Sequence, residues 1–178
     1  MGDIRLFVSH AHKDHKIAAA LVEVIEAAMV PRERILCTSH FDPKYREKDG
    51  VNVIKYLRDH LTQSSCVIGV LTPNSINSPW CLLELGGAWA RATRTYCVIA
   101  GEVSLESIPV LKDADAAQLT EPEEIRRLLA NLRRALGWDE RVRGTAAEEI
   151  NDLVYLASRV QKLNEEQVQD KADQEDVA

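Results

Sequence analysis

The sequence predicts an α/β fold in which helices cover both faces of a parallel β-sheet. Short β-rich runs alternate with amphipathic helical patterns along most of the chain, as they do in proteins built from βαβ units. One run, SCVIGVLTP at 65–73, has an uninterrupted apolar centre, which a central strand buried on both faces requires. In such folds ligands bind beyond the carboxyl ends of the strands. The loops at that edge are therefore the first place to look for a site.

The beginning of the chain predicts two strands separated by a helix. The strands are the β-rich runs 4–9 and 34–38. Asp14 is placed to cap the intervening helix, and Pro31 ends it. The apolar residues of this helix recur at the i, i+3, i+4 spacing of one buried stripe: Ile17, Ala20, Leu21, Val24, Ile25 and Ala28.

The middle of the chain predicts a long loop, a helix, the central strand and a further helix. The polar stretch 39–50 contains Pro43 and Gly50 and is longer than a plain connection needs to be. The helix that follows is marked by three spaced apolar residues: Ile54, Leu57 and Leu61. After the central strand, Ser78 is expected to cap the next helix and Pro79 to start it.

Two more strands and another helix follow. The strands are predicted at 96–100 and, more weakly, at 116–119. A capping box formed by Thr120 and Glu123 opens a helix that runs through Leu136, and Gly137, a residue typical of helix ends, follows it.

The C-terminal part predicts one more helix and an acidic tail. A second capping box, Thr145 to Glu148, opens the helix. The helix is striped by Ile150, Leu153, Ala157 and Val160. We accordingly divide the chain into a domain at 1–140, a C-terminal helix at 141–163 and a tail at 164–178 that is expected to be disordered.

Composition and charge point to a cytoplasmic protein. Of the net charge of −6, the acidic tail 164–178 carries about −5, so the remainder offers no basic face for nucleic acid. Neither an apolar run long enough to span a bilayer nor a secretory signal is evident, and we expect no membrane partner. The four cysteines form no CxxC pair and suit a reducing compartment.

Glu84 lies in the segment SPWCLLELGGAW, and two interpretations of it are open. A helical wheel puts Leu82, Leu85 and Trp89 on one face and Trp80, Glu84, Gly87 and Arg91 on the opposite one. Glu84 is then a solvent-facing side chain of an amphipathic helix. Trp80, a large aromatic one turn earlier on the same face, instead suggests a cleft that holds a carboxylate. The pair Gly86–Gly87 would allow close packing of the helix or close approach of a ligand.

Other kinds of site have weaker support. His10, His12 and His15 would point in different directions at a strand-to-helix turn, and no acidic or cysteine partner lies at ligand spacing, so we expect no metal. Cys81 as a nucleophile would need a histidine base that the sequence does not place. Neither GxxxxGK[ST] nor GxGxxG occurs, so the usual phosphate-binding loops are absent.

Four segments together resemble a TIR (Toll/interleukin-1 receptor) domain: LFVSHAHKD, ILCTS, VIGVLTPNSINSPWCLLELGGAWA and TYCVI. The resemblance covers roughly residues 3–137 and is closest to short prokaryotic TIR proteins, such as the TIR component of the Thoeris anti-phage system. It implies a flavodoxin-like three-layer sandwich whose five parallel strands have the order 2-1-3-4-5. The C-terminal helix at 141–163 lies outside it.

The resemblance also implies an active site. In the W-x-x-x-E segment of many prokaryotic and plant TIR domains the glutamate is catalytic for NAD+ cleavage. It maps here onto Glu84, and Trp80 maps onto the aromatic neighbour of the pocket. His10 falls where the family often has an aromatic, and Ala11 and His12 fall where some members carry arginines.

The polar stretch after the second strand corresponds to the BB loop of the family, Ser39–Gly50 in this sequence. That loop moves over the nucleotide or mediates assembly. It contains Phe41, which we include among the expected substrate contacts. Ser9 and Thr72, at the ends of the first and central strands, complete this set together with Trp80, His10 and His12.

The chemistry of NAD+ cleavage suits a single carboxylate. Glycosidases use two acids because the leaving oxygen needs a proton, whereas nicotinamide is already cationic in NAD+ and leaves as a neutral molecule. One carboxylate can bind the ribose hydroxyls and stabilise the developing oxocarbenium ion. We expect NAD+ as the substrate without a further cofactor, and either ADP-ribose or a cyclic form as the product.

The resemblance further implies a homo-oligomer formed through TIR–TIR contacts and a downstream effector that senses the nucleotide product in bacterial immune signalling. The alternative is a non-catalytic TIR scaffold that acts by assembly. Glu84 and Trp80 favour the enzyme, and the missing arginines beside His10 favour the scaffold.

Overall fold

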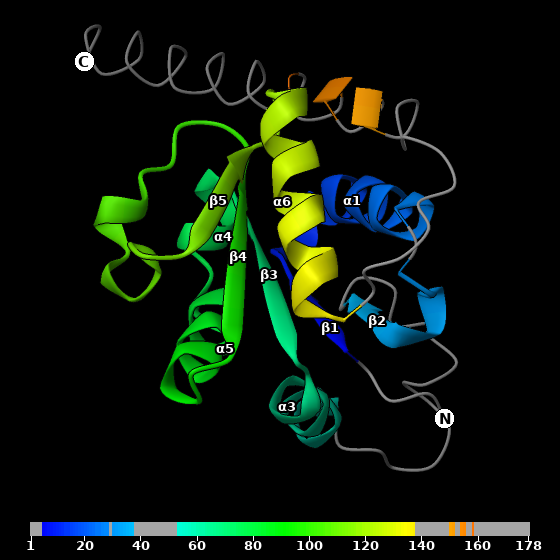
Figure 1. Cartoon of the computed structure of the whole chain (residues 1–178). Helices are drawn as coiled ribbons and strands as arrows, with labels where there is room; N and C mark the ends of the chain where they lie inside the picture. The colour runs from blue at the N-terminus through cyan, green and yellow to red at the C-terminus, as the bar shows by residue number, and fades with distance from the viewer. Residues whose placement is uncertain are drawn as a thin grey trace, which may run out of the picture.

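A parallel sheet of five strands lies between two layers of helices (Figure 1). The computed structural model describes residues 5–28, 30–37 and 53–137, together with positions 150, 151, 154, 155 and 158. The strands are β1 (Leu6–Ser9), β2 (Ile35–Cys37), β3 (Cys66–Leu71), β4 (Arg94–Ile99) and β5 (Asp115–Gln118). Their order, β2-β1-β3-β4-β5, and the parallel pairing of every neighbour confirm the predicted sheet.

Helices on the two faces connect these strands. They are α1 (His15–Ala27), α3 (Val53–Gln63), α4 (Pro73–Ile76), α5 (Pro79–Ala90) and α6 (Pro122–Ala135). Short 3-10 turns occur at η1 (His12–Asp14), η2 (Arg32–Arg34), η4 (Leu105–Ser107) and η5 (Pro109–Leu111). α1 and α6 pack on one face of the sheet, and α3 and α5 pack on the other.

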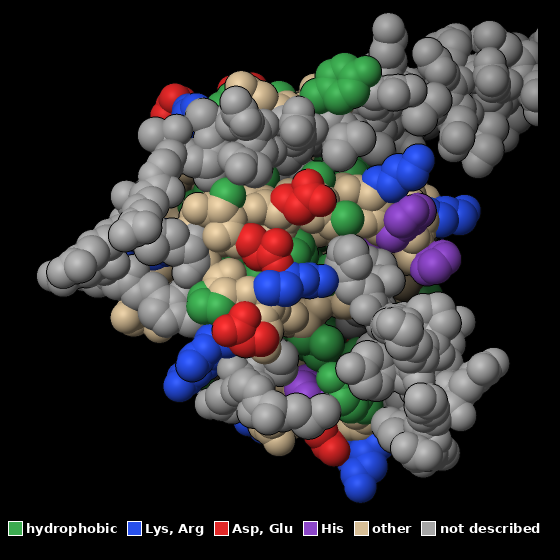
Figure 2. Space-filling view, turned by 90° about the vertical axis from the view of Figure 1, so that its right-hand side faces the viewer, with side chains coloured by type: hydrophobic (Ala, Val, Ile, Leu, Met, Phe, Trp, Pro, Cys, Tyr) green, Lys and Arg blue, Asp and Glu red, His purple; other side chains and the backbone are tan. Residues whose placement is uncertain are grey.

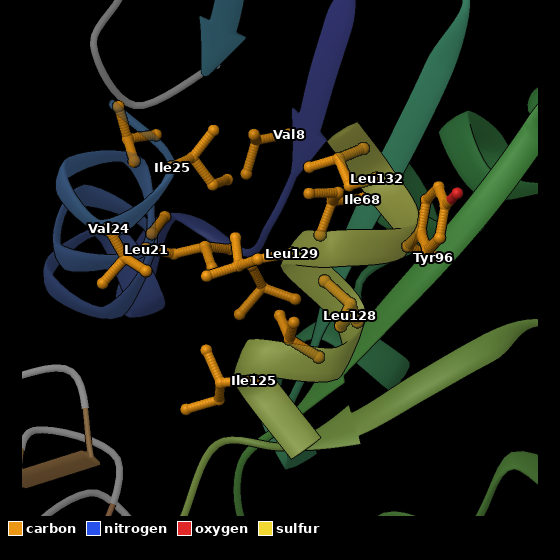
Figure 3. Packing of buried hydrophobic residues seen from close by; sticks show 14 of the residues in the cluster. Val8, Leu21, Val24, Ile25, Ile68, Tyr96, Ile125, Leu128, Leu129 and Leu132 are labelled. Carbon is orange, nitrogen blue, oxygen red and sulfur yellow. The ribbon is translucent and has the colours of Figure 1, made fainter. Parts of the chain in front are cut away.

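The larger apolar cluster fills the space between the sheet, α1 and α6 (Figure 3). Its α6 members are spaced i, i+3, i+4, i+7 and so form one buried stripe: Ile125, Leu128, Leu129 and Leu132. This stripe meets the buried stripe of α1 above Val8 and Ile68 of the sheet. Burial of these faces explains why a segment as charged as α6 forms a stable helix.

The smaller cluster lies on the opposite face, below α3 and α5. Side chains of a strand alternate between the two faces of a sheet. In β3, Ile68 and Val70 belong to the larger cluster, whereas Val67 and Leu71 belong to the smaller one. Burial on both faces is the reason that β3 is apolar without interruption.

The described part of the predicted C-terminal helix packs against the domain. Positions 150, 151, 154, 155 and 158 are helical. Ile150 is fully buried in the larger cluster, and Val154 packs against that cluster. The predicted capping box at Thr145 and the acidic tail lie outside the described residues. No helix in the described ranges combines the length and apolar character needed to cross a membrane.

Two of the predicted helix caps are wrong. Asp14 holds the N-cap position of α1, but its side chain makes no capping hydrogen bond. Thr120 does not cap α6, since the N-cap is Glu121, and Pro122 occupies the first turn. The acidic residue that does bond nearby, Glu124, accepts a hydrogen bond from the backbone N–H of Gln118 at 2.7 Å.

Other predicted helix ends are confirmed. Ser78 caps α5 by accepting a hydrogen bond from the backbone N–H of Cys81. Gly137, just after α6, has a φ of +72°, which glycine adopts without strain. The short helix α4 was not predicted, although Thr72 and Ser75 form a complete capping box at its start.

The α1–α6 interface predicts the cost of a core truncation. Leu128 is 1% exposed, so Leu128→Ala should lower the free energy of unfolding by about 2–5 kcal/mol. Leu82→Ala, which removes the same atoms from a side chain 43% exposed, should cost well under half as much. Denaturant unfolding of both variants measures the difference, and equal losses would contradict the assigned packing.

Candidate functional site

Glu84 lies on the buried face of α5. The buried positions of this helix are Cys81, Glu84, Leu85 and Ala88. Glu84 is only 4% exposed, whereas Trp89 is 61% exposed and Leu82 is 43% exposed. The helical wheel that grouped Leu82 and Trp89 on the packed face was therefore wrong about these side chains. The carboxylate belongs to the interior of the protein, and the solvent-facing interpretation of Glu84 does not hold.

The carboxylate of Glu84 meets the end of β1. The hydroxyl of Ser9 donates a hydrogen bond to Oε2 of Glu84 at 2.5 Å, and both residues are buried. Ser9 shares the face of β1 that carries Phe7, a member of the smaller apolar cluster beneath α5. Two residues 75 positions apart thus meet at the carboxyl edge of the sheet, where α/β folds usually bind ligands.

Burial controls the ionisation of Glu84. It raises the pKa of this carboxyl group from its ordinary value of 4.5 to about 7, while the Ser9 hydroxyl and then the Trp80 indole oppose the rise. The second oxygen, Oε1, is buried and has no hydrogen-bond partner in the described part of the chain. A buried carboxylate with one unpaired oxygen is poorly compensated for its lost hydration. Glu84 therefore changes charge near neutral pH.

An apolar groove runs between α3 and α5 beside this carboxylate. Its volume is about 240 Å³, and its lining residues are Leu57, Arg58, Leu61, Thr62, Trp80, Leu83, Glu84, Gly87 and Arg91. The surface that faces the groove is almost wholly apolar. Arg91 donates a hydrogen bond to the backbone carbonyl of Thr62 at 2.7 Å and so ties α5 to the end of α3. The size and the apolar character of the groove suit a flat organic ring.

Asp14 and Thr72 join the segments that follow β1 and β3. Oγ1 of Thr72 donates to Oδ2 of Asp14 at 2.6 Å, and Nδ2 of Asn74 donates to Oδ1 at 2.8 Å. The Thr72 hydroxyl also accepts from the backbone N–H groups of Asn74 and Ser75. Thr72 is 0% exposed, and its hydroxyl is fully engaged. The structure therefore gives Thr72 a role in joining the β1–α1 and β3–α4 segments.

The remaining predicted contacts are distributed differently. His10 is 4% exposed, and its Nδ1 lies 3.8 Å from Sγ of Cys37. His12 is exposed and stacks on His15, with ring centroids 6.0 Å apart. Figure 2 shows histidine side chains at one side of the face that carries α1, where acidic and basic side chains are interspersed. Phe41 and the loop Ser39–Gly50 lie outside the described residues.

The structure also bears on two other chemistries that the sequence raised. Within the ranges that the structure covers, no group of three or more His, Cys, Asp or Glu side chains is arranged to hold a metal ion. Burial is the main cause that raises the pKa of the Cys81 thiol. A raised pKa disfavours the thiolate that a nucleophile requires.

Several residues of the site escaped the sequence analysis. Leu57 and Leu61 were used only to predict a helix, and they also line the groove. Asp14 was expected to cap a helix. The pair Gly86–Gly87 needs no close packing, because a Cβ at Gly86 would meet nothing within 4 Å and one at Gly87 would make an ordinary contact. The sequence did contain a signal for the burial of Glu84. The i, i+3, i+4, i+7 spacing of one helix face places Glu84 on a single stripe with three apolar residues: Cys81, Leu85 and Ala88.

Comparisons with known proteins agree with this fold. The profile of a family described as "TIR domain" matches residues 6–130. The chain is also 30% identical, over 122 residues, to an uncharacterized protein of Bacillus subtilis (strain 168), YddK. That match covers 68% of this chain and 45% of the relative, so the chain spans less than half the length of the protein it resembles.

The shifted ionisation of Glu84 predicts a stability that depends on pH. The pKa of Glu84 is about 7 in the folded state, and its ordinary value is 4.5. Proton binding by Glu84 therefore stabilises the folded state, and this contribution is full below pH 4.5. It is lost as the pH rises through 7 and amounts to about 3 kcal/mol at most.

Glu84→Gln should therefore be more stable than the wild type at pH 8 and should lack this part of the pH dependence. Glu106→Gln, which changes an exposed carboxylate in the turn η4, is the matched control and should follow the wild-type curve. Denaturant unfolding at pH 5, 6, 7 and 8 measures the effect. Parallel curves for Glu84→Gln and the wild type would contradict the assigned burial of the charge.

Proposed function

The chain belongs to the TIR domain family, which includes both NAD+-cleaving enzymes and scaffolds, and we propose that it cleaves NAD+ at the nicotinamide–ribose bond. The observation that carries the proposal is a buried carboxylate, Glu84, that both borders an apolar groove and meets the end of β1. The product would serve as a nucleotide signal to a downstream effector in bacterial defence.

The groove suits the departing base. In NAD+ the nicotinamide ring carries a positive charge, and heterolysis of the C1′–N bond sends the bonding electron pair to the ring nitrogen and neutralises it. Apolar walls such as Leu57, Leu61 and Trp80 favour the neutral base over the cationic ring. The positive charges of Arg58 and Arg91 at the groove would offset the diphosphate.

The ionised Glu84 serves the other fragment. As the bond breaks, positive charge develops on the ribose as an oxocarbenium ion, and a carboxylate beside it lowers the energy of that state. Attack of water at C1′, with loss of one proton, gives ADP-ribose. Attack by a nitrogen of the adenine ring gives a cyclic product. No general acid is needed in either case, because the leaving base is neutral.

Incubation of the purified protein with NAD+ tests the proposal. The wild type should release nicotinamide, and Glu84→Gln should be slower by about 10²–10³-fold, the usual cost of losing one electrostatic contact in a transition state. Glu106→Gln should retain the wild-type rate. Chromatography of the nucleotides identifies the product. Equal release by wild type and Glu84→Gln would exclude Glu84 as the catalytic residue.

The ionisation of Glu84 predicts the pH profile of the same reaction. Because only the carboxylate stabilises a cation, kcat/KM should rise with pH through a midpoint near 7. Ser9→Ala removes the hydrogen bond that lowers the pKa of Glu84 and should move the midpoint upward by about one pH unit. A profile that is flat between pH 6 and 8 would contradict this assignment.

A separate observation favours assembly as a second function. The outer face of α5 carries Leu82 and Trp89, which are 43% and 61% exposed. TIR domains commonly self-associate, and contiguous exposed apolar side chains are typical of protein interfaces. We propose that this face takes part in TIR–TIR contacts. The expected contribution of the loop Ser39–Gly50 stays a prediction.

Substitution on the outer face of α5 tests the assembly. Trp89→Ser should weaken self-association by about tenfold or more, because a large aromatic at an interface is often a dominant contact. Tyr155→Ser removes an aromatic that is equally exposed, at 61%, on another surface and should have no effect. Sedimentation equilibrium over a range of concentrations measures both. Identical association of Trp89→Ser and the wild type would exclude this face.

A further inference from the structure

Gly69 lies in the middle of β3, directly opposite Ser9. The register of the parallel pair β1–β3 matches Ser9 with Gly69, and both residues point toward α5, since their neighbours Phe7, Val67 and Leu71 belong to the cluster on that face. Ser9 is the donor to Glu84. The position beside this donor is thus occupied by the one residue type without a side chain.

The space above Gly69 is filled by Leu85. A Cβ at position 69 would lie 2.9 Å from Cδ2 and 3.3 Å from Cδ1 of this leucine. Contacts under about 3.0 Å between carbon atoms are strongly repulsive, because the optimal separation is about 3.5–4.0 Å. Leu85 is 2% exposed and has little freedom to rotate in a packed interior. A larger residue at position 69 would therefore force the Leu85 side chain, and α5 with it where that side chain cannot rotate, to shift away from the sheet.

Glu84 is the immediate neighbour of Leu85 on α5. We infer that Gly69 is a positioning residue: its missing side chain lets Leu85 seat α5 closely against the sheet, and this brings the Glu84 carboxylate to the Ser9 hydroxyl. The inference rests on the proposed function in taking Glu84 as the reacting group. Gly69 itself contacts neither substrate nor reacting atoms.

The position of Gly69 distinguishes it from the other glycines of this region. Gly86 and Gly87 follow Glu84 directly in the sequence, but a Cβ at Gly86 meets nothing within 4 Å, and one at Gly87 lies 3.5 Å from Leu61, an ordinary contact. Gly69 is 15 residues before Glu84 in the sequence, and the fold places it against Leu85, the residue next to Glu84.

A set of four variants tests the inference: Gly69→Ala, Leu85→Val, the double variant of these two, and Gly86→Ala as the matched control. Crystal structures give the distance between Oγ of Ser9 and Oε2 of Glu84, and nicotinamide release gives the rate. Gly69→Ala should lengthen the contact from 2.5 Å to beyond about 3.0 Å and slow release by about tenfold or more.

Leu85→Val removes the terminal carbons that a Cβ at position 69 would strike. The double variant should therefore regain the short Ser9–Glu84 contact and most of the wild-type rate. Leu85→Val alone should improve neither the contact nor the rate relative to the wild type. Gly86→Ala adds the same methyl group in open space and should leave both readouts unchanged. Recovery in the double variant is the signature of positioning, since a general loss of stability would be deepened by a second core substitution.

Two results would overturn the inference. One is a Gly69→Ala structure in which Leu85 merely rotates and the Ser9–Glu84 contact stays at its wild-type distance. The other is a double variant that does not regain that contact. If Gly69→Ala fails to fold, the double variant gives the answer. A double variant that folds with a short Ser9–Glu84 contact supports the steric explanation, and one that also fails to fold contradicts it. The distances give this answer even if the wild type releases no nicotinamide, a result that would count against the proposed function alone.

Discussion

The hydrogen bond from Ser9 to Glu84 is the contact on which the candidate site depends. It joins the end of β1 to the middle of α5 at 2.5 Å, in a region where both partners are buried. Several features of the fold serve this contact. Gly69 leaves room for α5 to approach the sheet, and the bonds from Thr72 and Asn74 to Asp14 connect the segments that follow β1 and β3.

Burial of the Glu84 carboxylate costs the protein folding free energy. A carboxylate that is 4% exposed and has a pKa of about 7 opposes folding at the pH where it is charged. The protein tolerates this because two extensive apolar clusters, one on each face of the sheet, supply the stability. Buried carboxylates that oppose folding are common in sites that must stabilise a cation, because the carboxylate gains its ionic partner only when the cation forms.

The sequence predicted the sheet well and the site only in part. Strand order and the alternation of elements follow from hydrophobic patterns that are local, and Ser78 at the start of α5 followed from its side-chain chemistry. Glu84 and Trp80 were identified through the W-x-x-x-E resemblance. The bonding of Asp14 and Thr72, the burial of His10 and the steric role of Gly69 arise from contacts between distant segments. No local pattern encodes those contacts, and a wheel drawn for α5 alone misplaced Leu82 and Trp89.

The most direct test of this account is the titration of the Glu84 carboxyl group, followed by NMR on protein labelled with ¹³C at the glutamate side-chain carboxyl and assigned with Glu84→Gln. One glutamate resonance should titrate with a midpoint near pH 7, and that resonance should be missing from the variant. A midpoint near the ordinary value of 4.5 would show that the carboxylate is open to water and would contradict the buried site.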